Sequence, residues 1–317
     1  MSSDTSLPER PKLDFTLVRN GMDYLSSAVL YLMGKIQVPF EAKSLWPEAA
    51  KHHTFSQPTP PWLSDRHLKY GVLHLQAAAE VLLKARLVRE HWSLVFRDPG
   101  TATRAAYESG DFDSCGTTAA LDRLTKIVGV PITDRERKAI SDLAKTRNAL
   151  THYGHTASAY AVEARAAAVL SFLIDFVPRH LQPSLSSEAS EVASTMELVR
   201  GRLRTIEVLV KKREQDLASD LDKVAERVVK CPSCWQRALV VGETPVACRF
   251  CARTFESSAD AVAAYWEEIL DSEYTPEPEN CPACKQDEVV WATTRAAPDN
   301  GVELCFQCGT VYEERKA

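Results

Sequence analysis

Four Cys-x-x-Cys pairs in the C-terminal part of the chain limit what it can fold into more than any other feature. They contain eight of the nine cysteines in a sequence of 317 residues. Two cysteines at this spacing form a knuckle whose thiolates reach one metal ion, and two knuckles complete a tetrahedral shell for Zn²⁺. The odd total and the paired spacing argue against a disulfide framework and favour metal binding in a reducing compartment. The pairs are Cys231 and Cys234, Cys248 and Cys251, Cys281 and Cys284, and Cys305 and Cys308.

The spacing of these pairs predicts two separate zinc units. Thirteen residues separate the first two pairs, and twenty separate the last two. Each intervening segment indicates a hairpin, because residues 238–241 lead into Gly242 and residues 289–293 are followed by the turn signal Asn300-Gly301. The units resemble two zinc ribbons with structural ions, since four cysteines leave no coordination position for a substrate. Interleaved pairing of the knuckles and a thiol redox role for one pair stay open as alternatives.

Charge is divided unevenly along the chain. Residues 1–182 hold 22 Lys and Arg against 19 Asp and Glu, whereas the remainder holds 16 against 24. The acidic balance of the C-terminal part argues against the zinc units as the main surface for nucleic acid. No apolar stretch has the length of a membrane span and no secretory signal is visible, so we expect a cytoplasmic protein without membrane partners.

The first part of the chain has the pattern of a helical bundle, and the fold class is therefore expected to be mainly α. Glu80 and Lys84 form an i,i+4 pair beside the apolar face of the second helix. The third helix is expected to bury Leu121, Leu124 and Ile127. We expect helices at about residues 14–33, 64–91, 118–128, 133–152 and 156–176, with a long loop over residues 98–117.

A heptad seam follows the bundle and predicts one long helix within residues 183–230. Arg213 interrupts the seam, and the apolar positions resume after it with a shifted phase. Two interpretations remain, a coiled coil between two chains or a helix laid back along the bundle. The first part of the seam consists of Val192, Met196, Val199, Leu203, Ile206 and Val210.

The sequence thus divides into five segments. Between the zinc units we expect a short helix whose apolar face packs on its own unit, followed by an acidic linker that ends at Asn280. A protein partner that docks on the zinc units is also possible. The segments are a helical bundle at 1–182, a long amphipathic helix at 183–230, a first zinc ribbon at 231–255, a helix and linker at 256–280, and a second zinc ribbon at 281–317.

The fourth helix places two functional side chains near its C-terminal end. Thr133 and Glu136 have the spacing of a capping box, and Gly154 supplies a stop. Arg147 lies only about 20° from the centre of the inward face, whereas His152 lies about 140° further round the helix. Burying an unpaired guanidinium is costly, so Arg147 needs a partner. The simplest interpretation is an ion pair between helices, with His152 capping the helix end.

A second interpretation comes from a family resemblance. The run from Arg147 through Asn148 to His152 resembles the Arg-x4-6-His signature of the HEPN superfamily. The helix over residues 68–84, with Glu80 before Leu-Leu-Lys, is similar to an early helix of that family. The resemblance covers roughly residues 13 to 180, a little over half of the chain.

This resemblance implies a metal-independent endoribonuclease that works as a homodimer on an RNA substrate. Arg147 and His152 would be the catalytic residues, with Asn148 between them and Glu80 in a supporting role, and catalysis would need no cofactor. The family also suggests a toxin–antitoxin or antiviral defence setting. Many of its members have no known cleavage activity. The alternative is therefore a dimerisation or adaptor module that presents the zinc ribbons to a protein or nucleic-acid partner.

Overall fold

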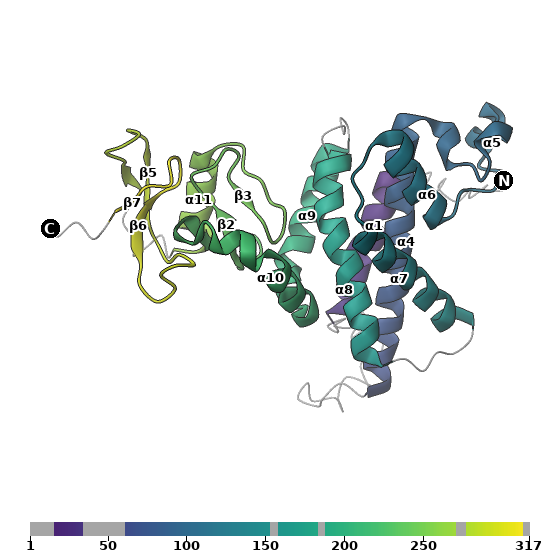
Figure 1. Cartoon of the computed structure of the whole chain (residues 1–317), viewed down its shortest axis with the longest axis horizontal. Coiled ribbons are helices and arrows are strands. Elements are labelled where there is room, and N and C mark those ends of the chain that lie inside the picture. The colour runs from purple at the N-terminus through teal and green to yellow at the C-terminus, as the bar shows by residue number, and fades with distance from the viewer. Residues whose placement is uncertain (1–15, 34–60, 153–157, 183–187, 271–276, 313–317) are drawn as a thin grey trace, which may run out of the picture.

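The structure is a computed structural model, and it describes residues 16–33, 61–152, 158–182, 188–270 and 277–312. The molecule is elongated, with helices at one end and two small sheets toward the C-terminus (Figure 1). The predicted mainly helical class and the two C-terminal cysteine units are confirmed at this level. None of the described helices combines the length and the hydropathy that a membrane crossing requires.

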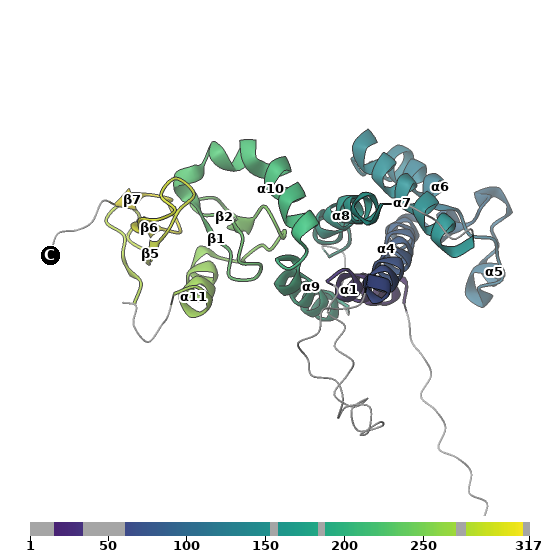
Figure 2. The same cartoon turned by 90° about the horizontal axis from the view of Figure 1, so that it is seen from below.

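Helix α4 is the centre of the bundle, and the other long helices pack around it (Figure 2). Its contact with α1 is close because two glycines face leucines: a Cβ at Gly21 would stand 2.6 Å from the Leu82 side chain, and one at Gly71 would stand 2.9 Å from Leu32. Burial of Leu82, which is completely buried, contributes about 1.5–3 kcal/mol. The bundle helices are α1 (Leu17–Leu32), α4 (Pro61–Glu90), α6 (Thr117–Arg123), α7 (Asp134–His152) and α8 (Ala159–Phe176).

The capping box predicted for α7 is confirmed. The Thr133 hydroxyl accepts a hydrogen bond from the backbone N–H of Glu136 at 3.2 Å, and the Glu136 carboxylate accepts one from the backbone N–H of Thr133 at 2.8 Å. Two backbone donors that the first helical turn leaves unpaired are satisfied in this way. The predicted stop at Gly154 lies outside the described residues.

Two sequence predictions around α6 are wrong. Helix α6 ends in a π-helical turn, η3 (Leu124–Val128), whose wider winding keeps Leu124 buried but turns Ile127 outward, so that Ile127 is 56% exposed. The expected loop over residues 98–117 contains a 3₁₀ turn, η2 (Pro99–Thr101), and a short helix, α5 (Arg104–Ser109). The side chains of Asp98 and Thr103 accept backbone hydrogen bonds at the start of these two turns. The turn residues around them favoured a loop in the sequence, so the two short elements were not predicted.

The single long helix expected after the bundle is also wrong. Two helices stand there, α9 (Ala189–Leu203) and α10 (Glu207–Asp222). The Thr205 hydroxyl donates to the carbonyl of Arg202 at 2.8 Å, and Ile206 leaves the helical region with φ −95° and ψ 86°. The buried seam of α9 packs on α1, and α10 packs on α8, so the bundle covers the seam within the chain, as the second interpretation expected.

Each cysteine unit contains a small antiparallel sheet, which confirms both predicted hairpins. The strands β1 and β4 precede the first cysteine of their units, so each unit begins a few residues earlier than the sequence suggested. The first sheet is β1 (Val228–Lys230), β2 (Arg237–Val240) and β3 (Ala247–Cys248), and the second is β4 (Glu279–Asn280), β5 (Asp287–Ala292), β6 (Val302–Cys305) and β7 (Val311–Tyr312).

Helix α11 (Ser258–Glu268) joins the two units. Its buried Tyr265 meets the edge of the Phe306 ring at 5.2 Å between centroids, so the helix also contacts the second unit, which the sequence did not predict. The units also touch directly, because the backbone N–H of Gly242 donates to the Phe306 carbonyl at 2.9 Å. Most of the expected acidic linker, residues 271–276, lies outside the described residues.

Candidate metal centres and the Arg147–His152 surface

The first cysteine group gathers four buried sulfurs in one place. The Sγ atoms of Cys231 and Cys251 are 3.8 Å apart, as are those of Cys234 and Cys248. A disulfide needs about 2.05 Å between sulfurs. A tetrahedral metal site with metal–sulfur bonds of about 2.3 Å places its sulfurs about 3.8 Å apart. The arrangement therefore fits a metal ion, and all four ligand atoms lie within 4.8 Å of one another.

The second group has the same arrangement in a more open setting. The Sγ atoms of Cys281 and Cys308 are 3.7 Å apart, and those of Cys284 and Cys305 are 3.6 Å apart. Cys308 is exposed and Cys284 is half-buried, whereas the other two are buried. Neighbouring knuckles share each site, so the interleaved alternative is wrong and the predicted pairing is confirmed.

All four knuckles repeat one backbone turn. In each, the residue after the second cysteine donates its N–H to the carbonyl of the first cysteine, at 2.8 to 3.0 Å, and adopts a left-handed backbone conformation. This turn brings both sulfurs of a pair to the same side of the chain, which is what binding of one metal ion requires. The residues at the left-handed position are Trp235, Ala252, Lys285 and Gly309.

The hydrogen bonds around the sulfurs favour a thiolate in each group. Three neighbouring cysteines lower the pKa of Cys231 well below its usual value, whereas complete burial raises that of Cys248. Burial opposes ionisation of Cys281, but hydrogen bonds from the Tyr312 hydroxyl and from backbone N–H groups outweigh it and lower the pKa to about 6. Thiolates crowded at such distances need a cation between them, as a metal ion would supply.

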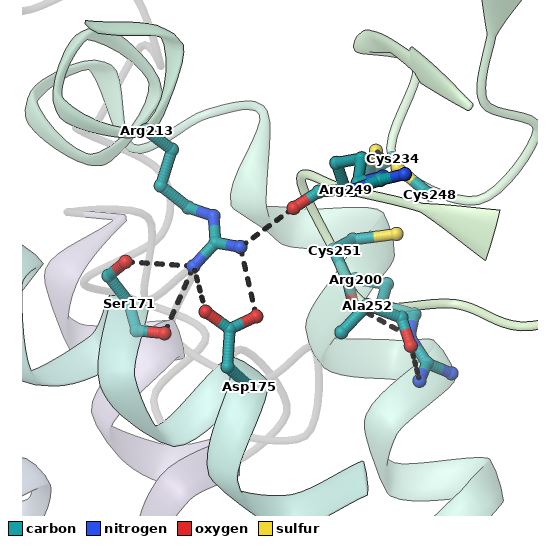
Figure 3. Close-up of polar contacts among 9 residues, drawn as sticks. All are labelled: Ser171, Asp175, Arg200, Arg213, Cys234, Cys248, Arg249, Cys251 and Ala252. Atoms are coloured by element: carbon teal, nitrogen blue, oxygen red, sulfur yellow. Dashed lines mark hydrogen bonds and ion pairs between the residues drawn. The ribbon is translucent and has the colours of Figure 1, made fainter. Parts of the chain in front are cut away.

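A buried arginine ties the first cysteine group to the bundle (Figure 3). Arg213 of α10 is 3% exposed and pairs with Asp175 of α8 at 3.1 Å. The same guanidinium donates to the backbone carbonyl and hydroxyl of Ser171 at 3.0 and 2.8 Å, and to the backbone carbonyl of Arg249 at 3.0 Å. Arg249 directly follows Cys248. Arg213, the residue that interrupts the heptad seam, therefore connects the knuckle of Cys248 and Cys251 to α8.

Arg200 of α9 holds the same knuckle from the other side (Figure 3). Arg200 is only 6% exposed. Its guanidinium donates hydrogen bonds to the backbone carbonyls of Cys251 at 3.2 Å and Ala252 at 3.4 Å. Hydrogen bonds from a charged donor are stronger than those between neutral groups. Two helices thus each direct one buried cation at the backbone of one knuckle. Between the second cysteine group and the helices lies a more exposed ion pair, in which Arg295 is 2.6 Å from Asp222 of α10.

The predicted catalytic residues lie at the C-terminal end of α7. Arg147 is half-buried, and Asn148 and His152 are exposed. The Asn148 side-chain oxygen accepts a hydrogen bond from the Arg147 guanidinium at 2.9 Å. The described residues include no carboxylate paired with Arg147, so the expected ion pair between helices is not found among them.

Glu80 has the i,i+4 pairing that its sequence spacing predicts, but Lys84 is buried and not at the surface. Its carboxylate accepts a hydrogen bond from Lys84 at 2.6 Å, and Lys84 also donates to Ser114 at 2.9 Å. No described contact joins Glu80 to Arg147. The supporting role that the family resemblance implies for Glu80 stays a prediction.

Sequence reasoning missed a second cation near Arg147. Arg165 of α8 is half-buried and donates to the Thr146 hydroxyl at 2.9 Å. Thr146 itself is buried and donates to the carbonyl of Asp142 at 2.8 Å. Arg165 has no acidic partner among the described residues. In the sequence it only interrupts an Ala-rich helix, and the packing of α8 on α7 is what brings it beside the motif.

One cavity lies between α7, α8 and α10, and two lie along the junction between the helices and the first cysteine group. Their volumes are about 380, 630 and 540 Å³, and Arg213 lines the first two. Comparison with family models, with curated proteins and with solved structures finds no match for the chain. Fold and site together define a mainly helical protein with two C-terminal groups of four cysteines that can each hold a metal ion.

Proposed function

We propose that the chain is a metal-independent endoribonuclease of the HEPN type, with Arg147 and His152 as its catalytic residues. The observation that carries this proposal is the half-buried Arg147, which has no acidic partner among the described residues and lies near an exposed His152. A partly desolvated cation without a carboxylate is costly to keep, and an RNA phosphate would supply the missing charge. A second cation, Arg165, donates a hydrogen bond to Thr146, the residue that precedes Arg147.

The residue types suit cleavage of RNA, because RNA carries its own nucleophile. The 2′-oxygen forms a bond to phosphorus while the bond from phosphorus to the 5′-oxygen breaks. An imidazole accepts the proton from the 2′-hydroxyl, and a second imidazole gives a proton to the departing 5′-oxygen. The Arg147 guanidinium stabilises the charge on the pentacoordinate phosphorus. The products are a 2′,3′-cyclic phosphate and a 5′-hydroxyl.

Two copies of the chain would assemble one site. Arg147 and His152 are five positions apart, so their side chains diverge by about 140° around α7. One helix cannot direct both groups at a single phosphate. A two-fold axis beside the end of α7 would bring the arginine of one copy to the histidine of the other and supply both imidazoles that the reaction needs.

We further propose that both cysteine groups hold structural Zn²⁺. The sulfur separations of 3.6 to 3.8 Å support this assignment, and so does the repeated turn in all four knuckles. An all-thiolate shell with tetrahedral spacing suits zinc in a reducing compartment, and it leaves no position for a substrate.

The test is cleavage of an end-labelled RNA by the full chain in EDTA, with zinc content measured before and after to confirm that the ions stay bound. We expect 2′,3′-cyclic phosphate ends, and a loss of about 100-fold or more in rate for Arg147→Ala and for His152→Ala. Lys145→Ala is the matched control, since Lys145 is exposed on the same helix and pairs with Asp142. Cleavage at the unaltered rate by either variant would contradict the proposal. A chain that cuts no RNA leaves the adaptor function as the better account.

A further inference from the structure

An exposed tryptophan projects from the first metal knuckle with two cations against its ring. Trp235 is 43% exposed. The guanidinium carbon of Arg204 lies 5.0 Å from the centroid of the indole, and the ammonium nitrogen of Lys230 lies 5.1 Å from it. Arg204 comes from the break between α9 and α10, and Lys230 ends β1. Three elements therefore build one aromatic and cationic surface.

The knuckle itself does not need a tryptophan at this position. The corresponding residues of the other three knuckles are Ala252, Lys285 and Gly309, which make the same turn without an aromatic ring. A left-handed backbone is uncommon for so bulky a residue. The turn therefore explains the backbone of Trp235 and leaves its side chain without a structural role in the metal site.

The two cations beside Trp235 also differ from their neighbours. Among the described residues neither Arg204 nor Lys230 has an acidic partner, whereas Arg249 pairs with Glu243 at 3.0 Å and Arg295 pairs with Asp222 at 2.6 Å. Residues 183–317 hold 24 Asp and Glu against 16 Lys and Arg, so this is a local positive surface on an acidic part of the chain.

We propose that Trp235, Arg204 and Lys230 bind single-stranded RNA, with a base stacked on the indole and the flanking phosphates held by the two cations. Bases of a single strand can stack on aromatic rings and on guanidinium planes, whereas those of a duplex are already stacked. Two cations without carboxylates around one aromatic ring match the repeating chemistry of a base and its phosphates. The proposal rests on the proposed function and deepens it, because the RNA substrate would be bound at a second surface in addition to the one at Arg147 and His152.

Trp291 of β5 provides the matched control. It is 42% exposed, but its ring lies against the backbone of Gly301, where an added Cβ would stand 2.1 Å from the indole. No cation lies over its ring among the described residues. The two tryptophans are equally exposed, but only Trp235 has cations against its ring. Comparing their variants therefore distinguishes RNA binding by the Trp235 surface from a general effect of removing an exposed indole.

The test measures binding of a fluorescent 2′-O-methyl RNA, which cannot supply the nucleophile for cleavage. We expect Trp235→Leu to weaken binding about tenfold or more and Trp291→Leu to leave it unchanged. Arg204→Gln should lower the slope of log affinity against log salt by about 0.7, the value for one lost contact with a single-strand phosphate. Intrinsic tryptophan fluorescence should be quenched by the RNA in the parent chain.

Equal affinity in the parent chain and in Trp235→Leu, with the zinc content of both unchanged, would overturn the proposal. An unchanged salt slope in Arg204→Gln would do the same, and that variant keeps the fold because the position is exposed. Because the probe is not cleavable, a chain that binds it but cuts no RNA would refute the nuclease activity and retain this binding surface.

Discussion

The two cysteine groups share one local geometry and differ in what surrounds them. All four sulfurs of the first group are buried in the main core of the molecule, and Arg200 and Arg213 hold its second knuckle to the helices. In the second group Cys308 is exposed. Its other sulfurs border a small separate core around Val289 and Cys305.

This difference shows how the same motif takes two structural roles. A metal ion in the first group would fix the backbone carbonyls that two buried guanidinium groups need, so its occupancy is linked to α9 and α10. The second group closes the C-terminal sheet, where successive residues of β5 alternate between faces. Val289 faces the small core, and its neighbour Val290 faces the main one. The first group should therefore organise the molecule, and the second should stabilise only its end.

The largest expected effect is the loss of one ligand from the first group. Cys248→Ser should release one metal ion and remove hydrogen-exchange protection from α9 and α10, because a structural zinc site contributes of the order of 10 kcal/mol or more of folding free energy. Cys305→Ser, the same position of the second group, should release the other ion and leave those helices protected. Metal analysis and hydrogen exchange measure both. Equal loss of protection in the two variants would remove the distinction between the groups.

A smaller effect is expected from the buried ion pair between the bundle and the first group. Arg213→Met should lower the free energy of unfolding, because it leaves Asp175 without its partner. The loss should lie toward the lower end of about 3–5 kcal/mol, since the Asp175 side chain is 31% exposed and water can solvate it in part. Adding Asp175→Leu should restore part of the loss. Arg295→Met, which breaks the ion pair beside the second group, should cost at most about 1 kcal/mol. Urea unfolding compares the variants, and similar costs would argue against a special role for Arg213.

The parts that the sequence predicts are those that depend on nearby residues. Each knuckle needs only two cysteines and one turn, so its spacing was enough to predict the sulfur groups. The capping box at Thr133 and Glu136 is equally local. The turn at Thr205 was missed because a hydroxyl bonded to the backbone ended a helix inside an intact heptad seam. Ile127 was misplaced because a π-helical turn changes the period on which the inward face was counted.

The remaining misses concern partners that are distant in the sequence. Arg200 bonds to the carbonyl of Cys251, and Arg165 reaches Thr146 on another helix. No pattern in the sequence identifies such contacts, because helix packing creates them. The Trp235 surface was missed for the same reason: one of its cations comes from the break between α9 and α10. The motif of Arg147 and His152 could be located from sequence, but the assembly that would unite its groups involves a second chain.

The smallest expected effect concerns a hydrogen bond that belongs to the second group. The Tyr312 hydroxyl lies 3.0 Å from the sulfur of Cys281 and lowers the pKa of that thiol. The four cysteines of the first group are all buried. Tyr312→Phe should weaken metal binding at the second group about tenfold, which is typical of the loss of a hydrogen bond to a metal ligand. The first group serves as an internal control, because its metal should be released to a competing chelator at an unchanged rate. Faster release from both groups would mean that the two sites are coupled through the contact between Gly242 and Phe306, and the second group would then be more than an end cap.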